Sequence, residues 1–540
     1  MNRAAAGLAG GAAVFGGITI LSRLAGFGRW GVFSAAIGSN ATGSAYTAAN
    51  SLPNILFEVV AGGALAAIAV PLLAAPLGAG RLAAASRTAS ALMTWALTVL
   101  IPLGAVLALA AEPLARALLD GAVEQARPGS TDLAAQLIRL FALQVPLYGV
   151  GLVASGVLQA AKRLFWPAFA PLLSSLTVIG VYLAFWLVAD GRQDYPAELS
   201  HSAIQLLGWG TTAGVAALTL PLLIPVRRLG IRWHWTYRFE PDQRRRAASL
   251  AGSGVGALLA QQAAVLTAVT LAGLVGGPGA LPTFNYAQAV YLLPYAVLAV
   301  PLAVSAFPNI AQWAASGKPS ELEAGVAGTT RLVLAVSAIG AALLIAAAPA
   351  IQVLFNLIDH SGDVSGLDGA VVAFAPGLVG FGLMAHLQRV LFAVDRSRPA
   401  AAVIAAGWLI AAGCGAGLAL AWRGGAASTV LALAAGTAVG MTVAGLGLLW
   451  QVNRALGGAA LSGLGRTAAV CLTIAAAGAA LGRVSGDAVL AASGDSLTGA
   501  SLSGLTAFGV VAGLAAVGLI AGDRGIFRAL PREPATPAPN

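Results

Sequence analysis

The chain has 540 residues, of which 58% are hydrophobic and only 9% charged, whereas soluble proteins carry roughly 25% charged residues. Its 30 basic and 20 acidic side chains are too few to cover a soluble protein of this size, and the mean hydropathy of +0.85 agrees. Most of the chain is therefore expected to lie in lipid, where backbone groups must be satisfied inside helices or a closed barrel. The apolar runs reach the ~20 residues of a spanning helix and do not alternate with period two, which favours helices.

Metal, cofactor, nucleic-acid and enzyme chemistry find little support. Cys414 and Cys471 lie inside apolar runs, and no CxxC, CxxH or HExxH pattern occurs, so we expect no metal site, no disulfide and no cofactor. The net charge of +10 comes from basic residues scattered between apolar runs, which is typical of topology signals and not of a nucleic-acid surface. No span contains paired carboxylates, and no GxSxG or Walker A pattern occurs, so the sequence does not predict an enzyme.

The apolar runs predict an all-helical membrane protein with fourteen spans. The start of the chain, Met1-Asn2-Arg3 before an apolar run, also resembles a signal peptide. That run continues through Arg23 and Arg29 without a small-residue cleavage site, so we expect a first helix that remains in the protein. The predicted helices lie near residues 10–36, 42–75, 88–111, 134–159, 166–190, 202–226, 246–275, 281–313, 328–357, 368–394, 399–422, 426–452, 462–484 and 503–522.

Basic residues gather in the loops on one side of the predicted membrane. The N-terminal side, with both tails, holds most of them, and acidic residues favour the opposite side. The positive-inside rule therefore places both termini in the cytoplasm. The densest basic segment joins the sixth and seventh predicted helices and also carries Trp233 and Trp235. We interpret it as an interfacial topology anchor, with a binding site for anionic lipid headgroups as the alternative. Its basic residues are Arg227, Arg228, Arg232, Arg238, Arg244, Arg245 and Arg246.

Two short patterns recur at a similar offset along the chain. Residues 157–168 read VLQAAKRLFWPA and residues 390–400 read VLFAVDRSRPA. A tyrosine likewise precedes a Leu-Pro pair both before Pro53 and before Pro294. The common offset supports two six-helix halves in parallel repeat, an organisation typical of transporters with a substrate path between the halves. The expected domains are an N-lobe at 1–230, a C-lobe at 231–455 preceded by the basic linker, two further helices within 456–529, and a disordered cytoplasmic tail at 530–540.

Three charged side chains fall at membrane depth, where each costs roughly 2.5–3.5 kcal/mol on insertion scales. If the first helix starts near residue 10, Arg23 lies ~20 Å deep, and Arg29 follows it in the same helix. A guanidinium in a cavity suits a phosphate or pyrophosphate, and the alternative is an arginine paired with a carboxylate or carbonyls for structure. Glu58 is the acidic residue in the middle of a span, and it either pairs with one of these arginines or carries a proton.

The second and eighth predicted helices are rich in helix breakers. Proline removes a backbone hydrogen bond and kinks a helix, so kinks at equivalent places in both halves suit helices that rock around a cavity. Kinks that serve packing alone are the alternative. The candidate gating or kink residues are Pro53, Gly63, Pro71, Pro294 and Pro308. Interhelical hydrogen bonding is the default role for the polar residues Gln159, Gln261, Gln262, Asn285 and Gln288.

Several short motifs occur in a characteristic order over about residues 7–450. They are Ser22-Arg23 through Gly26-Phe27 and Arg29, Ala41-Thr42, Leu52-Pro53-Asn54, Gly63-Ala64 through Val70-Pro71, Gln159 through Pro171, Tyr286-Ala287 through Phe307-Pro308, and Ala375-Pro376-Gly377 with Arg389 through Pro399. In this order they resemble the MurJ (MviN) family of lipid II flippases. The resemblance implies a fourteen-helix fold of the MOP exporter superfamily, with two lobes around a cationic cavity. It also implies transfer of a lipid-linked peptidoglycan precursor across the bacterial cytoplasmic membrane.

By position, Ser22, Arg23 and Arg29 match family residues that are expected to meet the headgroup or pyrophosphate. The chain also departs from the family pattern. Ser44 stands where an acidic residue is expected early in the second helix. The pairs Phe57-Glu58 and Gln288-Ala289 replace positions where many members carry arginine, so two expected cavity arginine sites are not basic here. The candidate substrate-binding residues are Ser22, Arg23, Arg29, Glu58 and Gln288.

The sequence thus predicts an alternating-access flippase for lipid II or a related polyprenyl-pyrophosphate substrate, with the polyprenyl tail left in the bilayer, in a groove near the last two helices. Membrane lipids are expected partners, and cell-wall synthesis proteins are a further partner class to consider. Three alternatives stay open at this point. They are a MOP-type exporter of another polyprenyl-linked saccharide, a drug exporter, and a non-transporting cell-wall scaffold.

Overall fold

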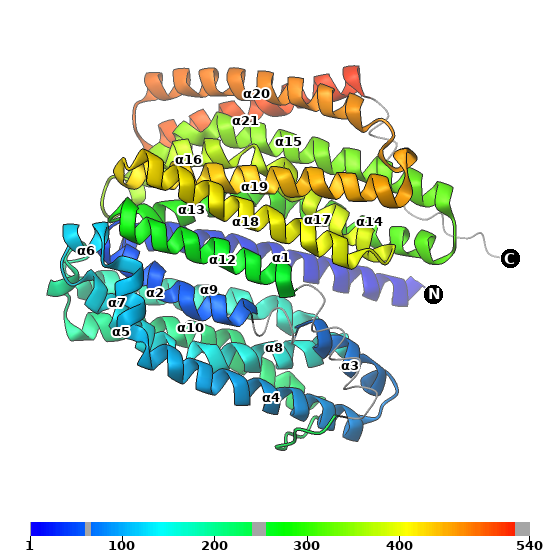
Figure 1. The fold of residues 1–540 in the computed structure, drawn as a ribbon, viewed down its shortest axis with the longest axis horizontal. Coiled ribbons are helices and arrows are strands. Elements are labelled where there is room, and N and C mark those ends of the chain that lie inside the picture. The colour runs from blue at the N-terminus through cyan, green and yellow to red at the C-terminus, as the bar shows by residue number, and fades with distance from the viewer. Residues whose placement is uncertain (1, 60–65, 240–254, 524–540) are drawn as a thin grey trace. The chain divides into compact units, whose positions relative to one another are not determined.

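The computed structural model describes residues 2–59, 66–239 and 255–523, and these residues form helices and no strand (Figure 1). Contacts divide the chain into two compact units. Unit 1 comprises Met1–Pro282 and Ile358–Val364, and unit 2 comprises Thr283–Leu357 and Ser365–Asn540. Unit 1 thus extends beyond the expected lobe limit at residue 230 to take in the next span. The expected tail at 530–540 lies outside the described residues.

Unit 1 covers the first seven predicted helical ranges, and a short loop from later in the chain, Ile358–Val364, also belongs to it. Its helices are α1 (Asn2–Ala36), α2 (Ala41–Phe57), α3 (Ala66–Gly78), α4 (Leu82–Leu109), α5 (Ala111–Leu119), α6 (Ala122–Ala126), α7 (Ser130–Phe141), α8 (Gln144–Ala160), α9 (Phe165–Ala189), η2 (Pro196–Glu198), α10 (His201–Arg228), α12 (Val255–Leu271) and η3 (Ala272–Gly276). Within it α9 packs against α1 and α10, and α8 packs against α4 and α10.

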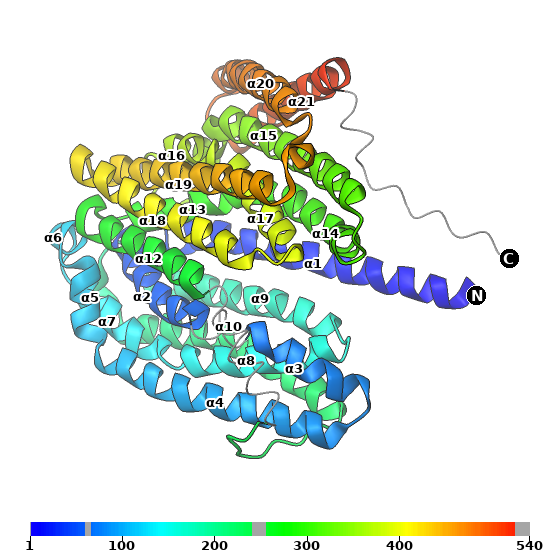
Figure 2. The ribbon, with the colours of Figure 1, turned by 45° about the vertical axis from the view of Figure 1, so that its right-hand side comes forward.

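Unit 2 holds the remaining helices. They are α13 (Ala280–Pro294, whose first turn counts with unit 1), η4 (Tyr295–Ala299), α14 (Val300–Ala315), α15 (Pro319–Ile358), α16 (Leu367–Phe374), α17 (Gly377–Ala393), α18 (Ser397–Trp422), α19 (Gly425–Leu456), η5 (Gly458–Leu461), α20 (Leu464–Ser493) and α21 (Leu497–Gly522). Here α19 packs against α16, α17 and α18, and α20 runs beside α21 (Figures 1 and 2).

Each of the fourteen predicted ranges falls on helix, so the all-helical membrane class is confirmed. Eleven described helices are long and apolar enough to cross a membrane, or twelve if the α16–α17 pair, bent by 45°, counts as one span. The count of fourteen is therefore approximate. Several predicted ranges break or change helix type within the described residues: 134–159 is α7 and α8, 246–275 contains α12 and η3, 281–313 is α13, η4 and α14, and 368–394 is α16 and α17. The range 42–75 contains α2 and α3, and residues 60–65 between them lie outside the described residues.

Prolines lie at several of these breaks. Pro53 lies inside α2, and residues 58 and 59 continue it as a wider π-helical turn. Pro294 ends α13, and the π-helix η4 follows at once. A proline ring clashes with the carbonyl four residues earlier, so a helix that continues past it widens or bends. Pro71 lies inside α3 and Pro308 inside α14, while Gly63 falls outside the described residues.

The two recurring sequence motifs end their helices in the same backbone conformation. Lys162 ends α8 with φ 58° and Asp395 ends α17 with φ 57°, both in the left-handed region that favours glycine. The next amide closes the turn in each case, from Arg163 N to Leu158 O and from Arg396 N to Leu391 O, both 2.8 Å. These bonds join residues five positions apart, the 6→1 pattern of a Schellman helix end. The two motif segments thus share a helix-end conformation as well as a similar sequence.

Each unit has its own core. In unit 1, the hydroxyl of Tyr46 on α2 hydrogen-bonds those of Tyr182 and Thr211, at 2.9 and 3.0 Å. Phe33 and Phe141 pack edge-on or tilted around these rings, with centroids 5.4–5.7 Å apart. Such pairs each contribute about 0.5–1.5 kcal/mol beyond their buried area. The cluster fixes α1, α2, α7, α9 and α10 against one another.

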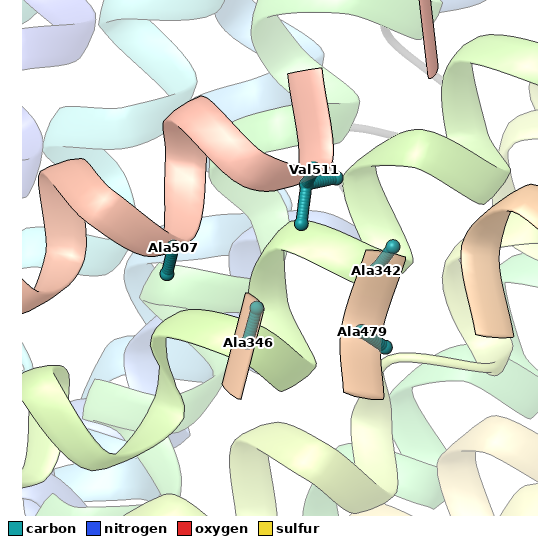
Figure 3. Close-up of a cluster of buried hydrophobic side chains, with 5 residues drawn as sticks. All are labelled: Ala342, Ala346, Ala479, Ala507 and Val511. Carbon is teal, nitrogen blue, oxygen red and sulfur yellow. The ribbon is translucent and has the colours of Figure 1, made fainter. Parts of the chain in front are cut away.

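In unit 2 the last two helices pack through small side chains. Figure 3 shows Ala342 and Ala346 of α15 beside Ala479 of α20 and Ala507 and Val511 of α21, and all five are buried. Small residues let helix backbones approach closely, which is the main source of helix association in lipid. The C-terminal pair is therefore a packed part of unit 2.

Candidate functional site

A cavity of about 540 Å³ lies in unit 1 between α1 and the segment that runs from the end of α8 into α9. This volume is within the usual range of ligand pockets, about 300–1,000 Å³. Two helical stripes form its walls, because residues three, four and seven apart share one face of a helix. The α1 stripe is Thr19, Ser22, Arg23 and Gly26, and the opposite wall is Gln159, Leu164, Pro167, Ala168, Pro171 and Ser175.

Arg23 supplies the positive charge of this cavity. Its side chain is exposed, and it makes no hydrogen bond or ion pair with any residue that the structure describes. The expected structural alternative, an arginine neutralised by a carboxylate, is therefore not seen among those residues. An unpaired guanidinium beside the hydroxyl-bearing Ser22 can bind an anion through charge-assisted hydrogen bonds.

Arg29 lies farther along α1 and is not among the residues that line this cavity. It is half-buried, and its charge acts on Tyr46, Tyr148 and Tyr182. The six-residue separation turns Arg29 about 240° around the helix from Arg23, to a different face. The structure therefore separates two arginines that the sequence placed in one site, so that Arg23 lies at the cavity and Arg29 near the tyrosine cluster.

Glu58 follows the last residue of α2 and is exposed. No described basic residue forms an ion pair with it. Its neighbourhood is ordered by Tyr148, whose hydroxyl donates to Asn54 Oδ1 at 2.8 Å and whose ring packs against Phe57 with centroids 4.6 Å apart. The charges of Arg29 and Glu58 both act on Tyr148. The expected Arg–Glu58 ion pair is thus replaced by two charges of opposite sign near the same phenol.

A second cavity of about 290 Å³ adjoins the first. The two share Gln159, Pro167 and Pro171. Away from Gln159 its wall is mostly apolar and includes Phe57 and Tyr148. The Gln159 amide donates to Ser155 Oγ at 2.9 Å, within one turn of α8. Gln159 is therefore a site residue that sequence reasoning treated only as a source of interhelical bonding.

The other predicted site residues lie elsewhere. Gln288 is half-buried on α13 in unit 2, and it is not among the residues of either cavity described above. Ser44, in place of the acidic residue that the family pattern has, is buried, and its hydroxyl accepts a hydrogen bond from Gly279 N at 2.9 Å. A larger or charged side chain at residue 44 would disturb this packing, so this position serves structure in unit 1.

A buried carboxylate fixes the end of α1. Asp359, 6% exposed, follows α15 in the chain but belongs to unit 1. It accepts hydrogen bonds from Ser34 Oγ at 2.5 Å, from Ser39 N at 3.0 Å and from Ser361 N at 3.0 Å. These bonds order the turn between α1 and α2 and so position the α1 stripe. The sequence found Asp359 only as a loop acid without a motif.

Nothing in the described ranges 2–59, 66–239 and 255–523 groups three or more histidine, cysteine, aspartate or glutamate side chains in a way that could hold a metal ion. The two adjoining cavities are lined by the cation of Arg23 together with hydroxyl groups, the Gln159 amide and prolines.

The two helical units, their internal repeat and a cationic cavity define a membrane transporter of the repeat-built class. Comparison with known proteins makes this specific. The family model described as lipid II flippase MurJ matches residues 33–486. The chain therefore belongs to the MurJ family, as the motif order predicts.

Individual relatives agree. A probable lipid II flippase MurJ from Rhizobium tropici is 28% identical over 401 residues, covering 71% of this chain and 70% of the relative. The lipid II flippase MurJ of Burkholderia cenocepacia is 26% identical over 381 residues, covering 67% and 69%.

Solved structures give the fold. A lipid II flippase MurJ in an inward closed conformation matches with a TM-score of 0.68 at 15% identity, covering 94% of this chain and 99% of that one. An inward-facing multidrug resistance MATE family transporter of the MOP superfamily matches with a TM-score of 0.64 at 14% identity, covering 84% and 99%. At these identities the likeness establishes the fold, and the predicted MOP architecture is confirmed.

Proposed function

We propose that this chain is an alternating-access flippase that moves lipid II from the inner to the outer leaflet of the bacterial cytoplasmic membrane. Membership of the MurJ family supports the cargo. The observation that carries the proposal at the level of residues is the unpaired Arg23 on a cavity of about 540 Å³ in unit 1. A pyrophosphate supplies the negative charge that would pair with this guanidinium, and its oxygens match the paired N–H donors of arginine.

Each part of the cavity then has a role. Arg23 binds the pyrophosphate, and the Ser22 hydroxyl donates a further hydrogen bond to the same group. The Gln159 amide and the Ser175 hydroxyl offer donors and acceptors of the kind that sugar hydroxyl groups need. Arg29 adds long-range positive potential from the tyrosine cluster. The polyprenyl tail stays in the bilayer, because transfer of its apolar surface into a polar cavity is unfavourable.

Rocking of the two halves would move the cargo across. The kinked helices support this, since Pro53 and Pro294 each precede a π-helical turn, and such turns often mark functional places in helices. We propose Pro53, Pro71 and Pro308 as further points of bending. Movement of one charge across the membrane potential is worth about 2.3 kcal/mol per 100 mV. The potential can therefore drive a conformational change that moves the unpaired charge of the cavity.

We also propose that both termini lie in the cytoplasm, because basic residues are in excess in the loops on the N-terminal side of the membrane. Membrane lipids and cell-wall synthesis proteins are the proposed partners. An exporter of another polyprenyl-linked saccharide is the second candidate. The observation in its favour is that Glu58 and Ala289 stand where the family resemblance leads us to expect arginine, so the charges that this chain offers to a headgroup differ from the family pattern.

A replacement assay tests the proposal. The native flippase is depleted in a bacterial host, this chain is expressed, and lipid II exposed at the outer face is measured. We expect exposure to be restored, lost by Arg23→Ala and partly kept by Arg23→Lys. Arg192→Ala is the matched control, because Arg192 is an exposed arginine of unit 1 outside the cavity. Correct insertion without lipid II exposure would overturn lipid II as cargo, and full activity of Arg23→Ala would overturn the role of the cavity charge.

A further inference from the structure

The segment that follows α10 is fastened to α4 by a row of hydroxyl groups. Residues 231–239, called here the linker segment, have no helical structure. Three of their amides donate to α4. Arg232 N bonds Ser86 Oγ at 3.1 Å, His234 N bonds Ser90 Oγ at 3.1 Å, and Thr236 N bonds Thr94 Oγ1 at 3.2 Å.

This row of hydrogen bonds can form because the spacing of the hydroxyl groups on α4 matches the spacing of the amides in the linker segment. Successive hydroxyls on α4 are four residues apart, which is about 6 Å along a helix that rises 1.5 Å per residue. Successive bonded amides are two residues apart, which is about 6.6 Å in an extended chain. An extended segment can therefore follow this face of a helix amide by amide. Tyr237 continues the contact, since its carbonyl accepts from Trp95 Nε1 at 3.2 Å and its hydroxyl lies 3.0 Å from Thr98 Oγ1.

The linker segment forms one side of an open pocket of about 280 Å³. Its walls come from α4, α8, α10 and the linker segment, and its apolar lining includes Met93, Leu97, Val150 and Leu223. Trp233 and Trp235 form the side that the linker segment contributes. A segment that served only as an interfacial topology anchor would need exposed tryptophans but would not need a pocket beside them.

Two arginines lie close in sequence to residues that line this pocket. Arg227 follows the lining residue Leu223 by one helical turn, and Arg232 precedes the lining residue Trp233 by one position. Both arginine side chains are exposed, and neither forms an ion pair with a described residue. Two cations without a described acidic partner therefore stand close in the chain to residues that line the pocket.

Exposed aromatic rings mark the depth of this place. Trp235 is 73% exposed, Tyr237 52% and Trp95 46%. Tryptophan and tyrosine gather where the acyl chains meet the headgroups. A mostly apolar pocket at that depth suits an acyl chain, and the exposed arginines close to it in sequence suit a phosphate group.

We propose that the linker segment, α4 and α10 form a binding site for one anionic phospholipid of the bilayer. An acyl chain occupies the pocket, and the phosphate binds Arg227 and Arg232. The ligand is a resident membrane lipid, so this site is separate from the cargo cavity that Arg23 lines.

Native mass spectrometry of the purified full chain in detergent tests the site, with phosphatidylglycerol and phosphatidylcholine of the same acyl chains as probes. We expect one phosphatidylglycerol to be retained in preference to phosphatidylcholine. The double variant Arg227→Gln/Arg232→Gln should weaken its retention by about fivefold for each arginine removed, the effect of one basic residue near a membrane surface. Met93→Trp, which fills the pocket and keeps the charge, should also abolish retention.

The matched control is Arg454→Gln, because Arg454 is an exposed helix-end arginine beside a tryptophan, Trp450, in unit 2. Retention should survive in this control and in Arg23→Ala. Equal retention of both lipids, or loss in Arg454→Gln as large as in the double variant, would overturn the site. Loss in the double variant with full retention in Met93→Trp would overturn the pocket and leave a surface charge effect. Unchanged thermal unfolding of each variant excludes misfolding as the cause of a loss.

Discussion

The guanidinium of Arg331 on α15 donates from Nη2 to both carboxylate oxygens of Asp523, at 2.6 and 2.8 Å. Arg331 Nε also donates to Thr467 Oγ1 at 2.8 Å, and the Thr467 hydroxyl donates to Asp523 at 2.5 Å. Only 19% and 6% of the two charged side chains are exposed. One cluster thus joins α15, the start of α20 and the residue that follows α21, and it fastens the C-terminal helices to unit 2.

This cluster predicts a pH effect on stability. Asp523 lies just past the end of α21, outside the span. Burial alone would raise its pKa, but hydrogen bonds from Thr467 and Arg331, together with the charge of Arg331, hold the pKa below the usual range. A lowered folded-state pKa stabilises the fold fully above the ordinary value of about 3.9, and the contribution is lost as the pH falls through the folded-state value.

We therefore expect the thermal unfolding midpoint of the full chain in detergent to be steady from about pH 7 to 5 with respect to this group, and to fall below about pH 4. Asp523→Asn should unfold earlier at neutral pH, by about 1–3 kcal/mol for lost bonds to a charged group. Its midpoint should also depend less on acid. Asp495→Asn, an exposed aspartate in the same unit, serves as the control. Identical acid profiles for Asp523→Asn and the parent chain would contradict the role of the pair.

The left-handed helix ends predict stabilising changes. A residue with a side chain costs about 1–2 kcal/mol in this conformation, and glycine avoids that cost. We expect Lys162→Gly and Asp395→Gly each to stabilise the chain by about 0.5–1 kcal/mol, measured by thermal unfolding, and to add when combined because they lie in different units. Lys162→Ala keeps a Cβ and should bring no such gain. A loss of stability in both glycine variants would argue against the assigned backbone.

The buried carboxylate of Asp359 predicts a large loss. Asp359→Ala would leave the Ser39 amide and the Ser34 hydroxyl buried without their acceptor. We expect destabilisation of about 3 kcal/mol, because bonds to a charged group are worth more than neutral ones and their donors stay buried. The check is denaturation of the full chain, with Asp120→Ala, an exposed loop aspartate, as the comparison. Equal stability of the two variants would show that other groups hold this turn.

The shared wall residue Gln159 predicts a charge effect on transport. Gln159→Glu introduces an anion into the cavity that Arg23 lines, where it would compete with a pyrophosphate for the guanidinium. We expect about a tenfold loss of lipid II exposure, which corresponds to ~1.4 kcal/mol, and a smaller loss for Gln159→Leu. Gln125→Glu, exposed on α6, controls for the added charge. Unchanged transport in Gln159→Glu would remove this residue from the site.

Glu58 predicts a dependence on protons. It is exposed at the end of α2 and lacks a described basic partner, so its charge is free to change during a transport cycle. We expect Glu58→Gln to insert normally and to transport with a flatter pH profile than the parent chain. The profile is measured as lipid II exposure across external pH. Normal transport with an unaltered profile would exclude Glu58 as a proton carrier.

Much of the fold follows from sequence because lipid makes the pattern simple. Long apolar runs locate the helices, and the Leu-Pro recurrence before Pro53 and Pro294 identifies the repeat. Breaks within runs are harder to place. The run at 42–75 looks like one regular helix because Pro53 is compatible with a kinked helix, and only the backbone reveals the π-helical turn that follows Phe57.

Only part of the candidate site can be predicted from the sequence, for a related reason. A charge at membrane depth is conspicuous, so Ser22-Arg23 stands out in the sequence. Gln159 and Ser175 do not, because their importance depends on which helices pack together, and α1 packs against α9, far from it in the chain. Arg29 is expected beside Arg23 because both match family cavity residues, whereas the helical turn between them directs the two side chains to different surroundings.

Because every second amide of the linker segment bonds to α4, the number of residues in the segment can change only by an even number without disturbing these bonds. Alternate amides meet successive hydroxyls, from Arg232 at Ser86 to Thr236 at Thr94. Insertion of one residue between these positions would turn the wrong amides toward α4 and swap the two sides of the segment, whereas insertion of two would restore the alternation after a local bulge. A stretch that looks like an ordinary connection therefore tolerates changes of length in steps of two.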